Sequence, residues 1–206
     1  MGRKKQNPQE SVKHQRVLDM AAKMFMTQSY HEVSMDALAD AVPVSKRTLY
    51  NHFKDKKALF SAVMQARCQY VFKRFTEELQ QVRSVEQTLI GLGRQFLGVV
   101  LEPDAVNIYR TAIMQTQHFP DLGKRFYEMG PKRSTAVLAE YLRKMHGEGK
   151  LHITDAELAA NTFLGMLINR THMKCLLGLK KSVSKAEREK IIRYVVQVFF
   201  HGNQPR

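Results

Sequence analysis

The chain has 206 residues, 44% of them hydrophobic and 25% charged, a composition typical of a globular protein with a sizeable core. This composition excludes a disordered chain, and the most apolar stretch, residues 89–101, is interrupted by Arg94, so no segment is predicted to span a membrane. Lys and Arg number 33 against 19 Asp and Glu, and this net charge of +14 favours nucleic acid first and an anionic membrane surface second, although simple solubility would also account for it.

Polar residues 6–10 follow the basic start of the chain, where a signal peptide needs an apolar run, so we expect a cytoplasmic protein. The two cysteines, Cys68 and Cys175, are far apart and form no CxxC pair, which argues against a disulfide framework or a zinc ribbon. No metal or cofactor is expected.

Apolar residues recur at three- and four-residue spacing along almost the whole chain, which predicts an all-α protein of about nine helices. Pro131 falls inside the seventh of these and is expected to kink or split it. The helices are predicted over residues 8–27, 36–41, 45–51, 55–82, 85–101, 104–117, 121–145, 155–177 and 184–200.

The segment 34–53 has the pattern of a helix-turn-helix, in which two short helices are joined by Val42-Pro43-Val44. Leu38 and Leu49 are apolar where the two helices would pack together. The remaining polar side chains of the second helix would then face outward, as a helix in a DNA major groove requires. An ordinary surface pair of helices has the same spacing and remains the alternative.

Residues 16–60 contain a run of short motifs: Arg16-Val17-Leu18, Ala21-Ala22, Phe25, Val33-Ser34-Met35, Leu38-Ala39, Val44-Ser45-Lys46, Thr48-Leu49-Tyr50, His52-Phe53, Lys56 and Leu59. Through these residues the segment resembles the N-terminal domain of the TetR family of bacterial repressors, in its AcrR-like branch. Farther along, His118-Phe119-Pro120-Asp121-Leu122 and Phe126-Tyr127-Glu128 resemble the AefR-like C-terminal domain. The resemblance implies a three-helix DNA-binding domain at 8–57 and an effector-binding and dimerisation domain at 58–206.

The resemblance also implies which side chains bind DNA. Phosphate contacts would come from Ser34, Tyr50, His52 and Lys56, and base contacts from Ser45, Lys46, Arg47, Thr48 and Asn51. Arg47 could read a guanine or hold a phosphate, and the rings of Tyr50 and His52 could instead pack on the helix pair.

Three positions depart from the family pattern, in which Gly is usual at residues 29, 43 and 47. Pro43 cannot adopt the positive φ that Gly supplies, so the turn must be built differently, with Val42 in an extended conformation. The basic Arg3, Lys4 and Lys5 would form either a minor-groove arm or a solvated terminus.

Residues beyond 58 are expected to form a mostly apolar ligand pocket and a homodimer interface made by the last two helices. In the interface, Ala159, Ala160, Gly165 and Gly178 would allow close approach beside the apolar end of the last helix. Aromatic and apolar side chains are the candidates for lining the pocket: Phe72, Phe75, Phe96, Tyr109, Ile113, Met114, Phe126, Met129, Phe163 and Met166. Each of them could equally belong to the hydrophobic core.

These observations predict a ligand-responsive transcriptional repressor, associated with the nucleoid, that binds palindromic operators as a homodimer and is released by an apolar small molecule. A redox sensor acting through Cys68 or Cys175 is the alternative. The histidines lack HxxxH or HExxH spacing and no phosphate-binding loop appears, so an enzyme is not expected. An RNA- or lipid-binding module would need interleaved aromatic residues or a long basic amphipathic face, which the sequence lacks.

Overall fold

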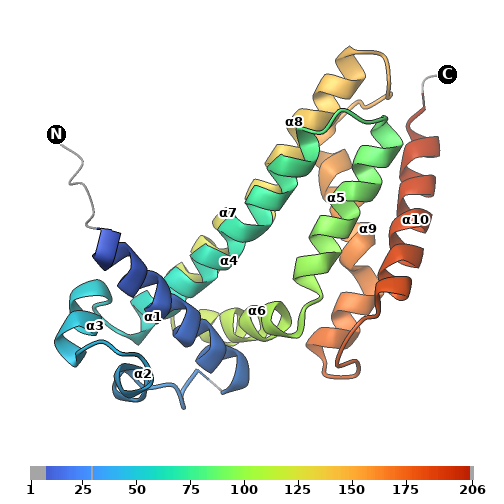
Figure 1. Cartoon of the computed structure of the whole chain (residues 1–206). Coiled ribbons are helices and arrows are strands. Elements are labelled where there is room, and N and C mark those ends of the chain that lie inside the picture. Colours follow the sequence, from blue (N-terminus) through green and yellow to red (C-terminus); the bar gives the residue numbers. More distant parts are fainter. Residues whose placement is uncertain (1–7, 29, 205–206) are drawn as a thin grey trace.

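The protein folds as ten α-helices in a computed structural model that describes residues 8–28 and 30–204, and no strand occurs within these ranges (Figure 1). This confirms the predicted all-α fold. In chain order the helices are α1 (Pro8–Thr27), α2 (Met35–Ala41), α3 (Lys46–His52), α4 (Lys56–Leu79), α5 (Val85–Val100), α6 (Pro103–Thr116), α7 (Pro120–Met129), α8 (Pro131–Gly147), α9 (Ala156–Leu176) and α10 (Lys185–Gly202).

Local capping explains why most helices begin where the sequence predicted. Ser or Asp precedes six of them, and each side chain accepts a hydrogen bond from the backbone N–H three residues later. Helices α6, α7 and α8 begin with Pro, whose missing N–H costs nothing at that position.

The predicted seventh helix is split at Gly130-Pro131 into α7 and α8, which is why ten helices form rather than nine. Gly130 lies between the two helices with φ −108° and ψ −89°, outside the helical region. Pro131 has no N–H to continue the helical ladder across this joint.

The first three helices pack against the beginning of α4, forming the cluster seen at the blue end of Figure 1. Its core contains Phe25, Leu38, Leu49 and Phe60, all essentially inaccessible to solvent. The same cluster also includes Ile108 of α6 and Leu122 of α7. The packing therefore continues past residue 58, where the sequence suggested a domain boundary.

The second cluster lies between the far half of α4 and helices α5, α8, α9 and α10. Phe75, Leu92, Leu142 and Phe163 are at its centre. Helix α4 is thus shared by both clusters, while α6 lies across one end of the bundle, between α1 and α9 (Figure 1).

No helix in the described part of the chain is both long and apolar enough to cross a membrane. Within the same ranges, no three His, Cys, Asp or Glu side chains gather as a metal site would require.

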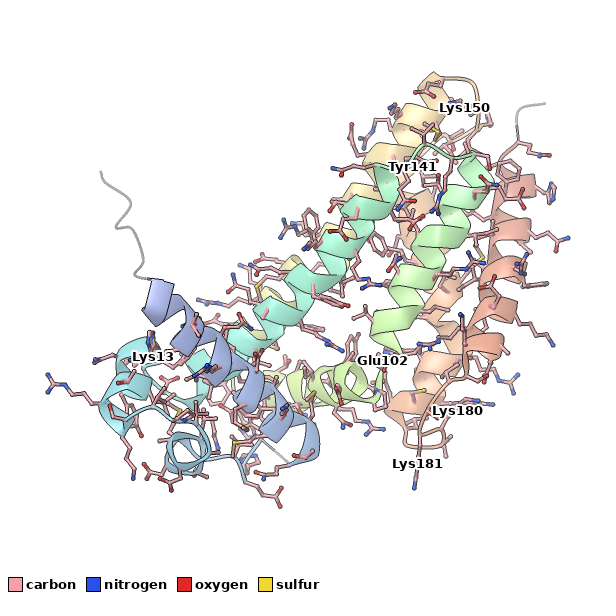
Figure 2. The ribbon with its side chains drawn as sticks, viewed as in Figure 1. Lys13, Glu102, Tyr141, Lys150, Lys180 and Lys181 are labelled. Carbon is pink, nitrogen blue, oxygen red and sulfur yellow. The ribbon has the colours of Figure 1, made fainter. Side chains whose placement is uncertain are left out.

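Basic side chains lie at opposite ends of the molecule, with Lys13 on α1 and Lys180 and Lys181 in the connection between α9 and α10 (Figure 2). The net charge therefore does not identify a DNA-binding face. That assignment depends on the geometry of α2 and α3.

Candidate nucleic-acid interface and ligand cavity

The turn between α2 and α3 is built around Pro43. Val42 has φ −118° and ψ 138°, so the extended conformation predicted for the residue before proline is confirmed. The N–H of Val42 closes α2 on the carbonyl of Leu38 at 3.1 Å, and that of Val44 donates to the carbonyl of Val42 at 2.6 Å. The described residues reach this geometry without a positive φ at any non-glycine position.

Three of the predicted DNA-binding side chains stabilise the helix pair itself. Ser34 accepts from the N–H of Ala37 at 3.0 Å, and Ser45 from that of Thr48 at 3.1 Å. The hydroxyls of Ser45 and Thr48 also lie 2.8 Å apart. These hydrogen bonds determine where α2 and α3 begin.

The outer face of α3 carries the exposed polar groups Lys46, Arg47, Tyr50 and Asn51, and the side chain of Tyr50 is 48% exposed. Lys46 forms an ion pair with Asp36 of α2 at 2.9 Å, and this hydrogen bond and charge raise the pKa of the lysine. On this face the guanidinium of Arg47, the amide of Asn51 and the phenol of Tyr50 are exposed, while Lys46 is paired with Asp36.

His52 is half-buried, and its ring centroid lies 5.4 Å from that of His14 on α1. His14 in turn stacks on Phe53 at 4.9 Å. The ring of His52 therefore contributes to the packing of α3 on α1 and leaves only part of its surface for DNA.

Lys56, a predicted phosphate contact, already has partners within the protomer. Its ammonium donates to the carbonyls of Tyr30 at 2.8 Å and His31 at 3.3 Å, and it lies 4.6 Å from the centroid of the Tyr30 ring. Burial lowers its pKa. Because an ammonium has three donors, a phosphate contact would have to use the third. Arg3, Lys4 and Lys5, predicted to form either a minor-groove arm or a solvated terminus, and Ser29 lie outside the described residues.

A cavity of about 240 Å³ lies between α4, α5, α6, α7, α8 and α9. Of the ten side chains suggested as pocket residues, Phe96, Tyr109 and Phe126 line it. The ring of Tyr109 contacts the rings of Phe126 at 5.3 Å and His172 at 5.2 Å.

The other seven suggested residues lie elsewhere. Phe75 and Phe163 belong to the packed core, while Ile113 and Met114 are exposed on α6. Phe72, Met129 and Met166 are partly buried but do not line the cavity. The guanidinium of Arg133 lies over the Phe72 ring. Met166 lies on the face shared by α9 and α10.

Sequence reasoning missed the polar residues of the cavity, Arg67, Ser134, Asn161 and His172. Burial lowers the pKa of His172, so its imidazole is neutral near pH 7. A search for apolar side chains could not select these residues; the available signal was the isolated Arg and His on otherwise apolar helix faces.

The two thiols are buried. Burial raises the pKa of Cys68, which lines the cavity, to about 11, and it also raises the pKa of Cys175. A peroxide-sensing cysteine needs the opposite shift, because the thiolate is the reactive form.

Helix α6 connects α1 to the end of α9 through two polar side chains. The amide of Asn107 donates to the carbonyl of Met26 on α1 at 2.8 Å and accepts from Arg110 at 3.0 Å. Arg110 then donates to the carbonyl of Leu176 at 2.7 Å and also to that of Cys175. Neither Asn107 nor Arg110 was singled out from the sequence.

The surface of α9 and α10 bears apolar side chains that the protomer leaves uncovered. Leu158, Tyr194 and Val198 are 62%, 69% and 48% exposed and border two grooves on this face. By contrast, Val195, Val196 and Phe199 of α10 and Ala160 of α9 pack into the protomer's own core.

Two family models match the chain. Residues 17–63 match the model of bacterial regulatory proteins of the tetR family, and residues 87–202, more than half of the chain, match that of the AefR-like transcriptional repressor C-terminal domain.

Individual relatives agree with these matches. The transcriptional regulator UidR of Escherichia coli K12 is 28% identical over 86 residues, which are 40% of this chain and 44% of UidR, so the match spans less than half of that relative. SrpR of Pseudomonas putida is 24% identical over 187 residues, 90% of this chain and 83% of SrpR.

Solved structures match over nearly the whole chain. A TetR-family regulator from Mesorhizobium loti is 25% identical with a TM-score of 0.87, covering 97% of this chain and 100% of that one. The flavonoid-responsive regulator FrrA is 29% identical with a TM-score of 0.74, covering 95% and 99%.

Proposed function

The chain belongs to the TetR family of bacterial transcriptional regulators, with an AefR-like C-terminal domain, and on this premise we propose that it is a ligand-responsive repressor. It binds a palindromic operator as a homodimer, in the cytoplasm at the nucleoid, and a small molecule releases it. The observation that carries this function is the exposed polar face of α3, held by the capped turn at Pro43.

In the proposed complex α3 enters the major groove. Arg47 and Asn51 supply donors for base edges or phosphates, and Tyr50 supplies a phenolic hydroxyl for the backbone. Ser34, Ser45, Thr48 and Lys56 act in part by holding the helices in position.

One α3 reads only a short half-site, so a twofold dimer is needed to read a palindrome. The uncovered apolar face around Leu158, Tyr194 and Val198 supports placing the dimer interface on α9 and α10. Gly165 lines the cavity instead and Ala160 packs in the protomer's core, so neither belongs to this face.

The effector would occupy the cavity, whose walls are connected to the DNA-binding helices in two ways. Helix α4 carries cavity residues and begins directly after the helix-turn-helix. Helix α6 carries Ala105, Ile108 and Tyr109 in the wall and Asn107 bonded to α1. A ligand that prefers one arrangement of these helices would change the spacing of the two α3 helices.

The aromatic walls of the cavity suit a ligand with a ring, and the similarity to the flavonoid-responsive FrrA agrees with that chemistry. An apolar pocket with a few polar groups is the usual form of a small-molecule site.

The test is to select genomic DNA fragments on the purified protein and sequence them. A repressor of this kind enriches fragments that share a palindrome, and a duplex carrying that palindrome binds more tightly than its scrambled counterpart. If no fragment is enriched even at low ionic strength, the proposed function is wrong.

A further inference from the structure

Two side chains of the cavity have buried polar atoms without a partner. Among the described residues, Nε of Arg67 and Nε2 of His172 are buried and make no hydrogen bond. His172 is only 6% exposed, and both residues line the cavity. Leaving a buried polar atom unpaired is energetically costly, so such atoms facing a cavity indicate where a ligand would bind.

No carboxylate faces Arg67 from within the cavity. None of the described residues that line the cavity is Asp or Glu, although Glu102 lines the neighbouring open cleft that Arg67 also borders. The other polar groups that line the cavity, Ser134, Thr135, Asn161 and the neutral His172, carry no charge to balance that of Arg67.

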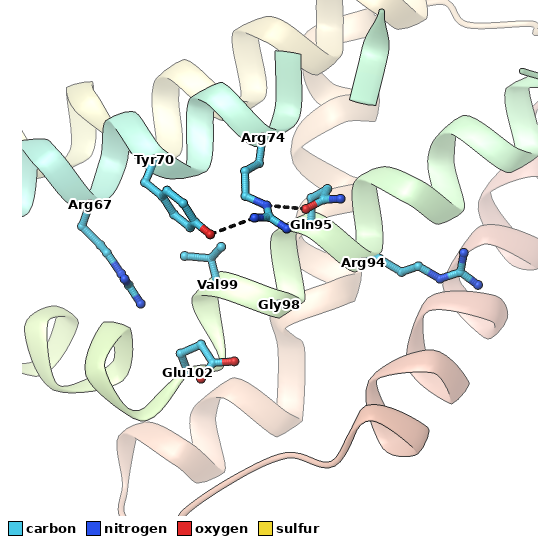
Figure 3. A pocket seen from close by; sticks show the side chains of 8 residues that line it. All are labelled: Arg67, Tyr70, Arg74, Arg94, Gln95, Gly98, Val99 and Glu102. Atoms are coloured by element: carbon cyan, nitrogen blue, oxygen red, sulfur yellow. Dashed lines mark hydrogen bonds between the residues drawn. The ribbon is translucent and has the colours of Figure 1, made fainter. Parts of the chain in front are cut away.

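Arg67 lies between the cavity and an open cleft of about 320 Å³ between α4 and α5 (Figure 3). The other arginines of the cleft already have partners. Arg74 donates to Gln95 at 2.6 Å and to the hydroxyl of Tyr70 at 2.8 Å, and Arg94 points away and binds Glu189. Arg67 stands apart from these pairs in Figure 3, with its guanidinium 5.9 Å from the centroid of the Tyr70 ring. Glu102, the carboxylate of this cleft, accepts from Arg188 at 3.2 Å, and Nε of Arg67 is left for a ligand.

The rest of the cavity wall is apolar. Phe96, Val100, Ile108, Phe126 and Ile168 line it. A volume of about 240 Å³ is below the usual range of drug-sized pockets, which begins near 300 Å³, and therefore favours a small ligand.

We propose that the cavity binds a small amphipathic acid whose anionic oxygen accepts a hydrogen bond from Nε of Arg67 and whose apolar body packs among Phe96, Ile108 and Phe126. His172 binds a second polar atom of the ligand through Nε2. This inference names the effector class for the proposed repressor and so rests on that function.

Two small ligands test the proposal directly by isothermal titration calorimetry. The sulfonate probe, p-toluenesulfonate, is one apolar ring with an anionic group, and the neutral probe, p-cresol, is the same ring without the charge. Both are titrated into the 206-residue chain without DNA, for wild type, Arg67→Met and Arg74→Met. Arg74→Met is the matched control, because Arg74 lines the cleft but not the cavity. Circular dichroism melting checks that the variants are folded.

We expect Arg67→Met to weaken binding of the sulfonate probe about tenfold or more, since a charge-assisted hydrogen bond is lost. Its binding of the neutral probe should change by less than about twofold, and Arg74→Met should change neither by more than that. An equal loss of both probes, an unchanged sulfonate affinity, or failure of wild type to bind the sulfonate probe would overturn the proposal. Operator binding, measured separately, tests the repressor function alone.

Discussion

Single side chains decide how closely the helices approach, and Gly91 on α5 is the tightest case. A Cβ placed there would lie 1.9 Å from Oε1 of Glu78, a buried carboxylate on α4 that accepts from Arg83 at 2.6 Å. Only a residue without a side chain allows this ion pair to lie between the two helices.

We therefore expect Gly91→Ala to displace Glu78 and to lower the free energy of unfolding by about 1–3 kcal/mol. Gly98→Ala on the same helix is the control, because its Cβ would meet nothing within 4 Å and it should leave stability unchanged or raise it. Urea unfolding at one protein concentration measures both variants. Equal stabilities for the two would show that the contact at Gly91 is unimportant.

The paired rings of His14 and His52 predict a pH dependence. Burial and the charge of His52 lower the pKa of His14 below its ordinary 6.5, and burial lowers that of His172. The unfolded chain then takes up these protons at higher pH than the folded one, so stability is full above about pH 6.5 and is lost as the pH falls below it.

His14→Phe keeps a ring against Phe53 but removes the titrating group. Between about pH 7.5 and 5.5, the free energy of unfolding should decrease less for His14→Phe than for wild type. The control is His201→Phe at an exposed position, for which the decrease should equal that of wild type. The same fall in His14→Phe as in wild type would refute this assignment.

At the scale of elements, α6 is a second connection between the cavity and the DNA-binding helices. Asn107 joins it to α1, and Arg110 joins it to the end of α9. Helix α4 was the connection evident in the sequence, because it follows α3 directly. The role of α6 depends on a side chain meeting a carbonyl 81 residues earlier, which no local pattern reveals.

Asn107→Ala should loosen α1 from α6, speed hydrogen exchange at the end of α1, and weaken operator binding about fivefold through loss of preorganisation. Gln69→Ala, an exposed amide on α4, serves as the control. Unchanged exchange at α1 in Asn107→Ala would mean that this hydrogen bond does not hold the two helices together.

The sequence was most informative where structure is set by neighbouring residues. Ser34, Ser45 and Pro43 determine the ends and the turn of the helix pair through contacts within three residues. The cavity is different, because Phe75 and Phe96 both belong to the packed core and only the rotation of the packed helices brings Phe96 to the cavity wall as well. Arg67 and His172 were missed because apolar side chains were the signal sought for a pocket.

At the scale of the whole molecule, the proposed dimer depends on the apolar face of α9 and α10. Tyr194→Glu places a charge there and should yield a monomer at about 10 μM by light scattering, with wild type a dimer, because burying an unpaired carboxylate opposes association. Tyr127→Glu, an equally drastic change on exposed α7, should stay dimeric. If Tyr194→Glu also remains dimeric, the interface lies elsewhere.

The assignment of α3 as the DNA-binding helix is tested most directly by two matched double variants titrated with the selected operator by fluorescence anisotropy. Arg47→Ala/Tyr50→Ala removes a cation and an exposed ring from α3. Lys181→Ala/Tyr127→Ala likewise removes a cation and an exposed ring, but from the connection between α9 and α10 and from α7. We predict a loss of affinity of about thirtyfold or more for the first and of less than about twofold for the second. Equal affinities for the two variants would contradict the account.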